Sequence, residues 1–218
     1  MQENNMKQLA ILVAMGMEAK PLLAKILDKT IQKIDGKRFF VGRIADRQVV
    51  LHKCGMGMRN ATKGAQALIK HFAPRILILY GVSGGLGDIS LAETVIATQS
   101  FPCSGKAWTA GIAAIADNEL AEHASALLGA KKAVIATSQG LIFNKKRKER
   151  IIERSNAVCI DIESYAVLTV AADANIKAIV LRCISDTKDP KSLLSFFKNG
   201  KIAANKAANQ VEKLILSL

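Results

Sequence analysis

The sequence predicts a single α/β domain over residues 1–218, in which helices cover both faces of a central, mixed but largely parallel twisted sheet. Three observations predict this three-layer class. Apolar segments of strand length alternate with amphipathic segments of helical period, which indicates crossover connections between parallel strands. No low-complexity linker and no internal repeat divides the chain. Its 218 residues, 50% of them hydrophobic, are enough for one full core and too few for two.

In the first half of the chain, each expected element follows from a local pattern. The apolar run Gln8–Ala14 predicts a buried strand, and the next segment, Glu18–Leu27, predicts a helix with Pro21 in its first turn, where proline is tolerated. Strand-like segments on both sides of a turn at residues 46 and 47 predict a hairpin. The other elements expected here are the hairpin strands Lys37–Ile44 and Gln48–Lys53, an amphipathic helix at Arg59–Phe72 and a buried strand at Arg75–Tyr80.

The second half begins with a glycine-rich loop at residues 81–85 and continues as alternating strands and helices. A strand is expected at Glu93–Thr98, whereas Gln99–Ile115 has no clear pattern. Helices that separate the later strands imply a largely parallel sheet, and the early hairpin makes it mixed. The further expected elements are helices at 117–128, 145–154 and 163–173, strands at 132–137, 157–161 and 177–184, and a terminal helix from about residue 201.

Composition argues against several classes of protein. No run of about 18 apolar residues could span a bilayer, and the N-terminus lacks the features of a signal peptide, so we expect a soluble, cytoplasmic protein. Cys54, Cys103, Cys159 and Cys183 have no C-x-x-C spacing, and the three histidines have no metal-ligand spacing. Reduced thiols and no metal site are therefore expected.

The formal charge of +13 is compatible with binding to nucleic acid or to a membrane surface, because positive potential attracts polyanions. The distribution of that charge favours a different interpretation. Basic residues are spread over most segments, and the densest run, Lys145–Arg150, opens a helix without aromatic residues among its basic ones. We therefore expect a solvated helix face there and no nucleic-acid partner.

Polar side chains gather where apolar segments end. The strand of residues 178–186 ends in Arg182, Ser185 and Asp186, and it follows an acidic helix start that contains Glu163. Glu18 follows the first strand in the same way. Because open α/β sheets bind ligands at the carboxyl ends of their strands, these side chains are candidates for chemistry. Three carboxylates at one sheet edge suggest a site that separates acid and base roles by environment.

The glycine-rich segment 81–85, with the sequence GVSGG, matches the G-x-S-x-G pattern of serine hydrolases. That interpretation is disfavoured because a strand rather than a helix follows, and because His123 is the only later histidine. Two interpretations stay open: a tight turn, or a loop whose backbone N–H groups approach an anion, a water or a sugar. The same two interpretations apply to Gly55 and Gly57, whose segment does not match the dinucleotide-binding fingerprint.

Five motifs together resemble those of the nucleoside phosphorylase superfamily, in particular the branch of 5′-methylthioadenosine/S-adenosylhomocysteine nucleosidases. Their order and approximate spacing agree over nearly the whole chain. The motifs are AMGME at 14–18, CGMG at 54–57 followed by Asn60 and Ala61, GVSGGL at 81–86, DIE at 161–163 and RCISD at 182–186. The resemblance implies a nucleoside phosphorylase-like three-layer α/β/α fold. It also implies cleavage of the N-glycosidic bond of a purine nucleoside, with adenine as the expected base.

The resemblance further implies a role for each site residue. Asp186 would be the general acid at purine N7, and Ser185 would help to position it. Glu18 would be the general base for the attacking water, with Arg182 nearby. Glu163 would accept hydrogen bonds from the ribose hydroxyls, a task that suits a carboxylate. The other expected substrate contacts are Ile162 under the sugar, Val82, Ser83 and Gly84 in the glycine-rich segment, and Leu141, Ile142 and Phe143 at the base.

The nucleophile is the main open point of the chemistry. Phosphorylases of this superfamily hold phosphate with arginines, one of them in the loop after the first strand. Here that loop contains Glu18, and its only cationic residue is Lys20. This composition favours water over phosphate as the nucleophile, and we expect the reaction to need no metal or cofactor. Phosphorolysis, with phosphate as co-substrate, stays an alternative because Arg182, Arg59 and the glycine-rich segment can bind an anion.

Departures from the family pattern leave further alternatives open. Val82 stands where nucleosidases often have a serine, Leu141 and Ile142 stand at the place of a base-stacking aromatic, and residues 101–115 do not match the usual substrate cover. The short chain and residues 185–190 also resemble the hopanoid-associated phosphorylase branch, which is associated with removal of adenine from an adenosyl lipid. For such a substrate, Trp108 could supply an apolar lip.

A nucleoside-binding protein without catalysis is the alternative from another class. The resemblance implies at least a homodimer, in which the neighbouring subunit closes each site.

Overall fold

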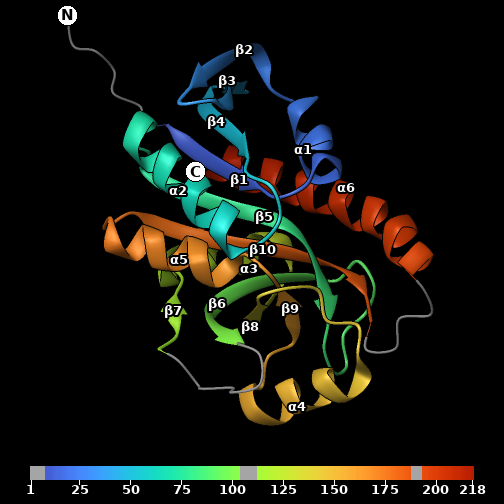
Figure 1. Cartoon of the computed structure of the whole chain (residues 1–218). Coiled ribbons are helices and arrows are strands. Elements are labelled where there is room, and N and C mark those ends of the chain that lie inside the picture. The colour runs from blue at the N-terminus through green and yellow to red at the C-terminus, as the bar shows by residue number, and fades with distance from the viewer. Residues whose placement is uncertain (1–7, 104–111, 188–192) are drawn as a thin grey trace, which may run out of the picture.

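The computed structural model describes residues 8–103, 112–187 and 193–218 (Figure 1). Helices separate single strands or runs of three strands along the chain. The strands are β1 (Leu9–Val13), β2 (Leu27–Ile34), β3 (Lys37–Ile44), β4 (Arg47–Lys53), β5 (Ile76–Gly85), β6 (Thr94–Cys103), β7 (Ala114–Ile115), β8 (Lys131–Ser138), β9 (Cys159–Asp161) and β10 (Lys177–Asp186). The helices are α1 (Gly16–Leu23), α2 (Met58–Phe72), α3 (Asn118–Leu128), α4 (Lys145–Ser155), α5 (Ser164–Asp173) and α6 (Leu193–Ser217).

One mixed sheet connects the strands of the described residues. Its hydrogen-bonded order is β10-β6-β8-β9-β5-β1-β4-β3-β2, with β7 paired to β6. Because β5 also pairs with β10, the strands β5, β10, β6, β8 and β9 close a ring from which β1, β4, β3 and β2 extend. β1 is parallel to β4 and β5, and β5 is parallel to β10, whereas β2, β3 and β4 form an antiparallel meander. The predicted mixed α/β class is confirmed; the ring was not predicted.

Helices lie on both faces of the sheet (Figure 1). They bury alternate side chains of its strands. On β1, Leu9 and Ile11 belong to the core shared with α1, α3 and α6, whereas Ala10 and Leu12 belong to the core shared with α2 and α5. A strand with apolar cover on both faces keeps no polar face, which is why β1 is a continuous apolar run in the sequence. A third, smaller core under α4 contains Ile151.

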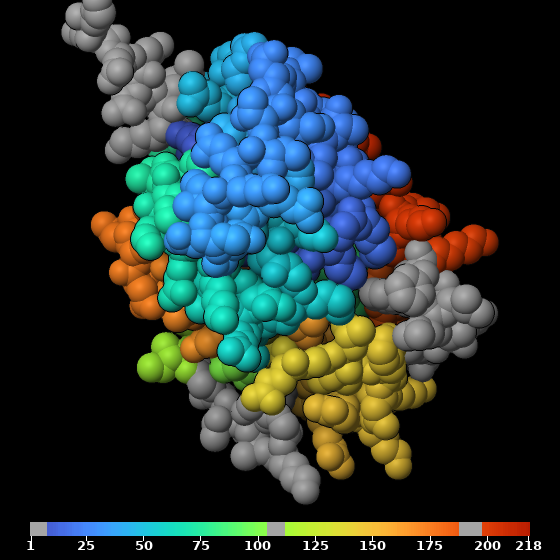
Figure 2. All heavy atoms as spheres, turned by 45° about the horizontal axis from the view of Figure 1, so that its top comes forward, coloured from blue at the N-terminus to red at the C-terminus, as the bar shows by residue number. Residues whose placement is uncertain are grey.

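Two expectations for the first half of the chain are wrong. The helix expected to reach Leu27 ends at Leu23, and Leu27–Ile34 forms β2 at the edge of the sheet. All residues of β2 but Ile34 are exposed, so no core-facing pattern marks it as a strand. Lys29 and Lys33 suit an edge, because lysines discourage pairing with another chain. Figure 2 shows this blue-to-cyan β2–β4 region on the near surface, above the yellow segment that leads into α4.

The expectations for three later segments also need correction. The glycine-rich segment is neither a loop nor a tight turn, because β5 continues through Gly85. There a Cβ would lie 2.9 Å from the carbonyl oxygen of Asp186, so the glycine permits close strand packing. β6 extends to Cys103 within the unassigned stretch, and α6 begins at Leu193 instead of about residue 201. The expected lip residue Trp108 lies outside the described residues.

Within the described part of the chain, no helix is long and apolar enough to cross a membrane.

Candidate active site

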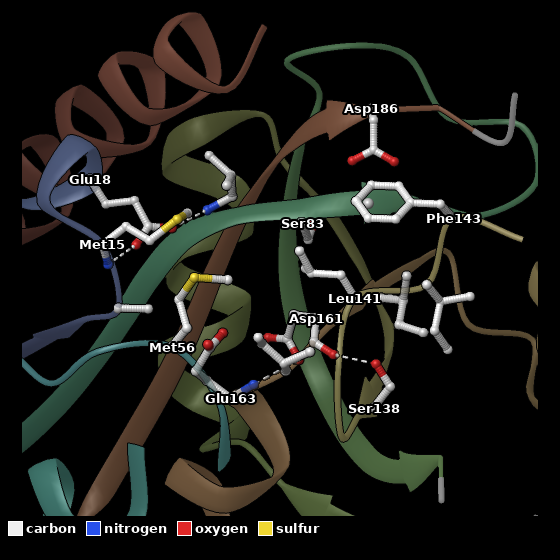
Figure 3. A pocket seen from close by; sticks show the side chains of 16 residues that line it. Met15, Glu18, Met56, Ser83, Ser138, Leu141, Phe143, Asp161, Glu163 and Asp186 are labelled. Atoms are coloured by element: carbon white, nitrogen blue, oxygen red, sulfur yellow. Dashed lines mark hydrogen bonds between the residues drawn. The ribbon is translucent and has the colours of Figure 1, made fainter. Parts of the chain in front are cut away.

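The ends of β1, β5, β8, β9 and β10 meet around one pocket of about 550 Å³, a volume that includes its open mouth. Figure 3 shows Glu18 and Met15 on one wall, Asp186 and Phe143 on the opposite wall, and Glu163 between them. The parallel strands β1, β5 and β10 end at a common edge, and β9, which runs antiparallel to β5, brings its end and that of β8 to the same place, so side chains from distant parts of the sequence meet there.

Glu18 lies in the first turn of α1 and is only 1% exposed. The backbone N–H of Met15 donates to its Oε2 at 2.7 Å, and the N–H of Val82 donates to its Oε1 at 2.9 Å. Burial raises the pKa of the Glu18 carboxyl, and this effect is opposed by the Arg182 guanidinium and by the backbone N–H groups. Such a carboxyl is fixed in place, and its raised pKa makes it a better proton acceptor than an exposed carboxylate.

Arg182 is fully buried and joins two carboxylates behind the pocket. Its Nε donates to Asp161 Oδ2 at 2.8 Å, and its Nη2 donates to Glu163 Oε2 at 3.2 Å. Asp161 also accepts from Thr137 Oγ1 at 2.7 Å and from the hydroxyl of Ser164. A buried guanidinium needs such partners, because an unpaired charge in the core is strongly destabilising. Asp161 therefore positions Arg182, a role that we did not predict for it.

Glu163 lies between the end of β9 and the start of α5 and is 4% exposed. The N–H of Gly57 donates to its Oε1 at 2.8 Å, and Arg182 donates to its Oε2. Burial raises the pKa of Glu163 to about 7 against the opposing effect of Arg182. Each carboxylate oxygen has two lone pairs, so each oxygen of Glu163 can accept one further hydrogen bond. This arrangement suits a vicinal diol.

Gly81 allows the two charged groups of this wall to approach each other. A Cβ on Gly81 would lie 2.3 Å from Glu18 Oε1 and 2.7 Å from Arg182 Nη1. Both distances are shorter than any ordinary contact to a Cβ atom, so a side chain there would displace Glu18 or Arg182. The first glycine of the GVSGG segment thus leaves room for the carboxylate and the guanidinium.

Asp186 ends β10 and has hydrogen-bond donors at both carboxylate oxygens. Ser185 Oγ donates to Oδ1 at 3.1 Å, and Lys148 Nζ donates to Oδ2 at 3.0 Å. On its other side, Asp186 faces Gly84, where a Cβ would lie 3.2 Å from Oδ2. The solvated helix face expected at Lys145–Arg150 is therefore wrong for Lys148, whose side chain is fully buried.

The segment between β8 and α4 supplies an apolar wall. Leu141, Ile142 and Phe143 all line the pocket, with Ile142 buried and the other two partly exposed. Met15 and Met56 face them across the cavity (Figure 3). An aromatic ring and two thioethers can cover both faces of a flat ligand. Phe143, which the sequence places one step away from the family's stacking aromatic, is thus the aromatic ring of this wall.

Most of the residues selected from the sequence line this pocket, while two lie behind it. Ser185 and Arg182 contact pocket residues without lining the cavity themselves. Four of the residues that we did not select lie within the quoted motifs at 14–18, 54–57 and 161–163, whereas the other two are marked only by their position at strand ends. The selected residues that line the pocket are Glu18, Val82, Ser83, Gly84, Leu141, Ile142, Phe143, Ile162, Glu163 and Asp186. Those that were missed are Ala14, Met15, Met56, Ser138, Ile160 and Asp161.

No group of three or more His, Cys, Asp or Glu side chains in the described ranges could hold a metal ion.

Comparisons with known proteins identify the family of the chain. Residues 8–216 match the phosphorylase superfamily. The 5′-methylthioadenosine/S-adenosylhomocysteine nucleosidase of Marinomonas sp. (strain MWYL1) is 27% identical over 229 aligned residues, which cover 96% of this chain and 99% of that protein.

Two solved structures share the fold. A proposed 5′-methylthioadenosine/S-adenosylhomocysteine nucleosidase from Francisella philomiragia has a TM-score of 0.90 at 26% identity, over 97% of this chain and all of that one. The futalosine hydrolase of Helicobacter pylori has a TM-score of 0.92 over 98% of this chain and 99% of that one; at 21% identity it supports the fold alone. Since the family match spans nearly the whole sequence, the chain belongs to the phosphorylase superfamily.

Proposed function

We propose that this protein is a nucleosidase that hydrolyses the N-glycosidic bond of a purine nucleoside, with adenine as the expected base, and releases the free base and a ribose product. The observation that carries the proposal is the placement of Glu18, Glu163 and Asp186 on separate walls of one pocket. Breaking this bond builds positive charge on the sugar and negative charge on the departing base. An acid is therefore needed at the base and carboxylates near the sugar, as in glycoside hydrolysis.

Each carboxylate has a distinct proposed task. Asp186 serves the base and delivers a proton to purine N7, while Ser185 fixes its orientation. Glu163 accepts hydrogen bonds from the two ribose hydroxyls, above the apolar surface of Ile162. Glu18 takes the proton of the attacking water. The replacement of the usual serine by Val82 leaves this assignment intact, because it is the backbone N–H of Val82 that orients Glu18.

The charges around the pocket favour water over phosphate as the nucleophile. The lining side chains include four carboxylates, those of Glu18, Asp161, Glu163 and Asp186, and among the described lining residues there is no lysine, arginine or histidine. Arg182 lies behind the wall and is already paired with two of these carboxylates. A phosphate dianion would therefore meet like charges, which destabilise it at short range. Phosphorolysis of a nucleoside or of an adenosyl lipid is the alternative.

Further properties are proposed with this function. The thioethers of Met15 and Met56, which face the apolar wall across the pocket, suit a 5′ substituent that is less polar than a hydroxyl, such as methylthio. The free thiols of the chain suit the reducing cytoplasm. We also propose a single domain over residues 1–218, from the chain length and the absence of a linker, and, from the family resemblance, at least a homodimer in which the neighbouring subunit closes each site.

The test is release of free adenine from 5′-methylthioadenosine, S-adenosylhomocysteine and adenosine, each with and without phosphate. Hydrolysis predicts release in phosphate-free buffer. Release only in the presence of phosphate would establish the phosphorolytic alternative. Tight nucleoside binding without any base release over hours would support a binding protein without catalysis.

A further inference from the structure

Lys148 is the only fully buried lysine of α4. The neighbouring Lys146 and Arg147 of this strongly basic helix are exposed, whereas the side chain of Lys148 is 0% exposed. Transfer of an ammonium group into a protein interior is unfavourable unless the group is paired and hydrogen-bonded. The position of Lys148 therefore requires a specific set of partners.

Those partners match the three N–H bonds of an ammonium group. Lys148 Nζ lies 3.0 Å from Asp186 Oδ2, 3.1 Å from the carbonyl oxygen of Thr187 and 3.5 Å from the carbonyl oxygen of Gly85. All three acceptors lie at the ends of β5 and β10, beside the pocket. A lysine held by three acceptors is a charged donor in a fixed position.

The contact with Lys148 determines how Asp186 can obtain a proton. Asp186 Oδ2 forms an ion pair with Lys148 Nζ at 3.0 Å, and Oδ1 contacts the hydroxyl of Ser185, whose single proton is shared with the carbonyl oxygen of Ser83. Asp186 lines the pocket, so a purine bound there separates it from pocket water. Lys148, which is buried on the other side of the carboxylate, is then the proton donor that stays in contact with Asp186.

We infer that Lys148 is the positioning residue and proton source of the leaving-group site, an inference that rests on the proposed function. As the C1′–N9 bond breaks, its electron pair passes to the purine. A proton moves from Lys148 Nζ to Asp186 and from Asp186 to N7, so the base leaves neutral and Lys148 becomes an amine. Glu18 takes one proton from water, whose oxygen bonds to C1′. After the base has left, pocket water returns that proton to Asp186, which lines the pocket, and Asp186 passes it back to Lys148. Catalysis thus uses three residues on the base side: Ser185, Asp186 and Lys148.

A purely structural role for Lys148 predicts different behaviour. If the lysine only tied α4 to the sheet, its loss would loosen the wall that carries residues 141–143. Every nucleoside would then bind more weakly, whether or not it has a nitrogen at position 7. A proton source instead affects turnover and leaves the binding of a 7-deaza nucleoside unchanged, because such a ligand has no N7 to protonate.

The experiment compares Lys148→Met, Lys148→Arg and the exposed control Lys146→Met with the parent protein. The measured quantities are kcat and KM for adenine release and the Kd of 5′-methylthiotubercidin, a 7-deaza analogue. We expect Lys148→Met to lower kcat about 100-fold, in the range of general acid catalysis, with Kd within about twofold of the parent. Lys148→Arg keeps the positive charge but cannot release a proton near neutral pH, so it should be similarly slow. Lys146→Met should match the parent.

Several outcomes would overturn the inference. A kcat of either Lys148 variant within about threefold of the parent would show that no proton comes from this residue, and a parallel loss of 5′-methylthiotubercidin binding would indicate a structural role. The double variant Lys148→Met/Asp186→Asn should be no slower than Asp186→Asn, because residues that act as a unit are not additive; additive losses would contradict the relay. Absence of base release by the parent would contradict the proposed function and this inference together.

Discussion

Substitution of Gly81 by alanine tests how closely Glu18 and Arg182 must approach each other. The new methyl group would lie 2.3 Å from Glu18 Oε1, and ordinary contact begins at 3.4 Å, so the carboxylate must move by about 1 Å. Such a shift breaks the hydrogen bond from the Val82 N–H, and a displacement of this size at a reacting group lowers turnover about 100-fold. Loss of one buried hydrogen bond to a charged group lowers the free energy of unfolding by about 1–3 kcal/mol.

The assay is adenine release at saturating nucleoside, together with urea unfolding of both proteins. Gly16→Ala is the matched control, because a Cβ at Gly16 would meet no atom within 4 Å. We expect this control to keep the parental kcat, while Gly81→Ala loses kcat with its fold retained. If Gly81→Ala turned over nucleoside at the parental rate, the close contact of Glu18 with this strand would have no part in catalysis.

The remaining predictions concern the carboxylates. Asp186→Asn should lower kcat about 10²–10⁴-fold with little change in unfolding temperature, and a variant as active as the parent would remove Asp186 as the acid. Because Glu163, with a pKa raised to about 7, must be ionised to accept the ribose hydroxyls, KM should rise as the pH falls below about 7; a flat KM between pH 5 and 8 would contradict this role. The same raised pKa means that the folded state binds this proton more tightly than the unfolded state. Its contribution to stability is therefore full below pH 4.5 and is lost as the pH rises through about 7, a dependence that Glu163→Gln should remove from urea unfolding curves. Asp161→Asn should destabilise the protein by about 3 kcal/mol, because it leaves Arg182 buried with one carboxylate fewer, and a change below about 1 kcal/mol would show that Glu163 suffices.

The sequence predicted the continuously apolar strands and the polar site residues that interrupt or follow them. Continuous apolar runs predicted β1 and β10 because helices cover both faces of these strands. The polar residues that interrupt or follow such runs, Glu18, Glu163 and Asp186, could be selected because strand ends in an α/β sheet face a common edge. Their convergence on one pocket follows from topology rather than from any property of the individual residues.

Other features depend on contacts that no local pattern encodes. Strand β2 was missed because its side chains are exposed and its position is set by pairing with β3. Lys148 has the sequence context of a surface lysine, and its burial depends on acceptors contributed by β5, β10 and Thr187. In the sequence, the glycines of β5 resemble those of a loop. In the structure they lie in a strand, and their lack of a Cβ leaves room for Glu18 and Asp186.

The central claim is that the pocket directs water to C1′ of a purine nucleoside. The most direct measurement is mass spectrometry of the sugar product after the protein has been incubated with 5′-methylthioadenosine in phosphate-free water enriched in oxygen-18. The account predicts release of unlabelled adenine together with a sugar that carries one heavy oxygen at C1′. Failure to release adenine until phosphate is added, with a sugar 1-phosphate as the product, would contradict it.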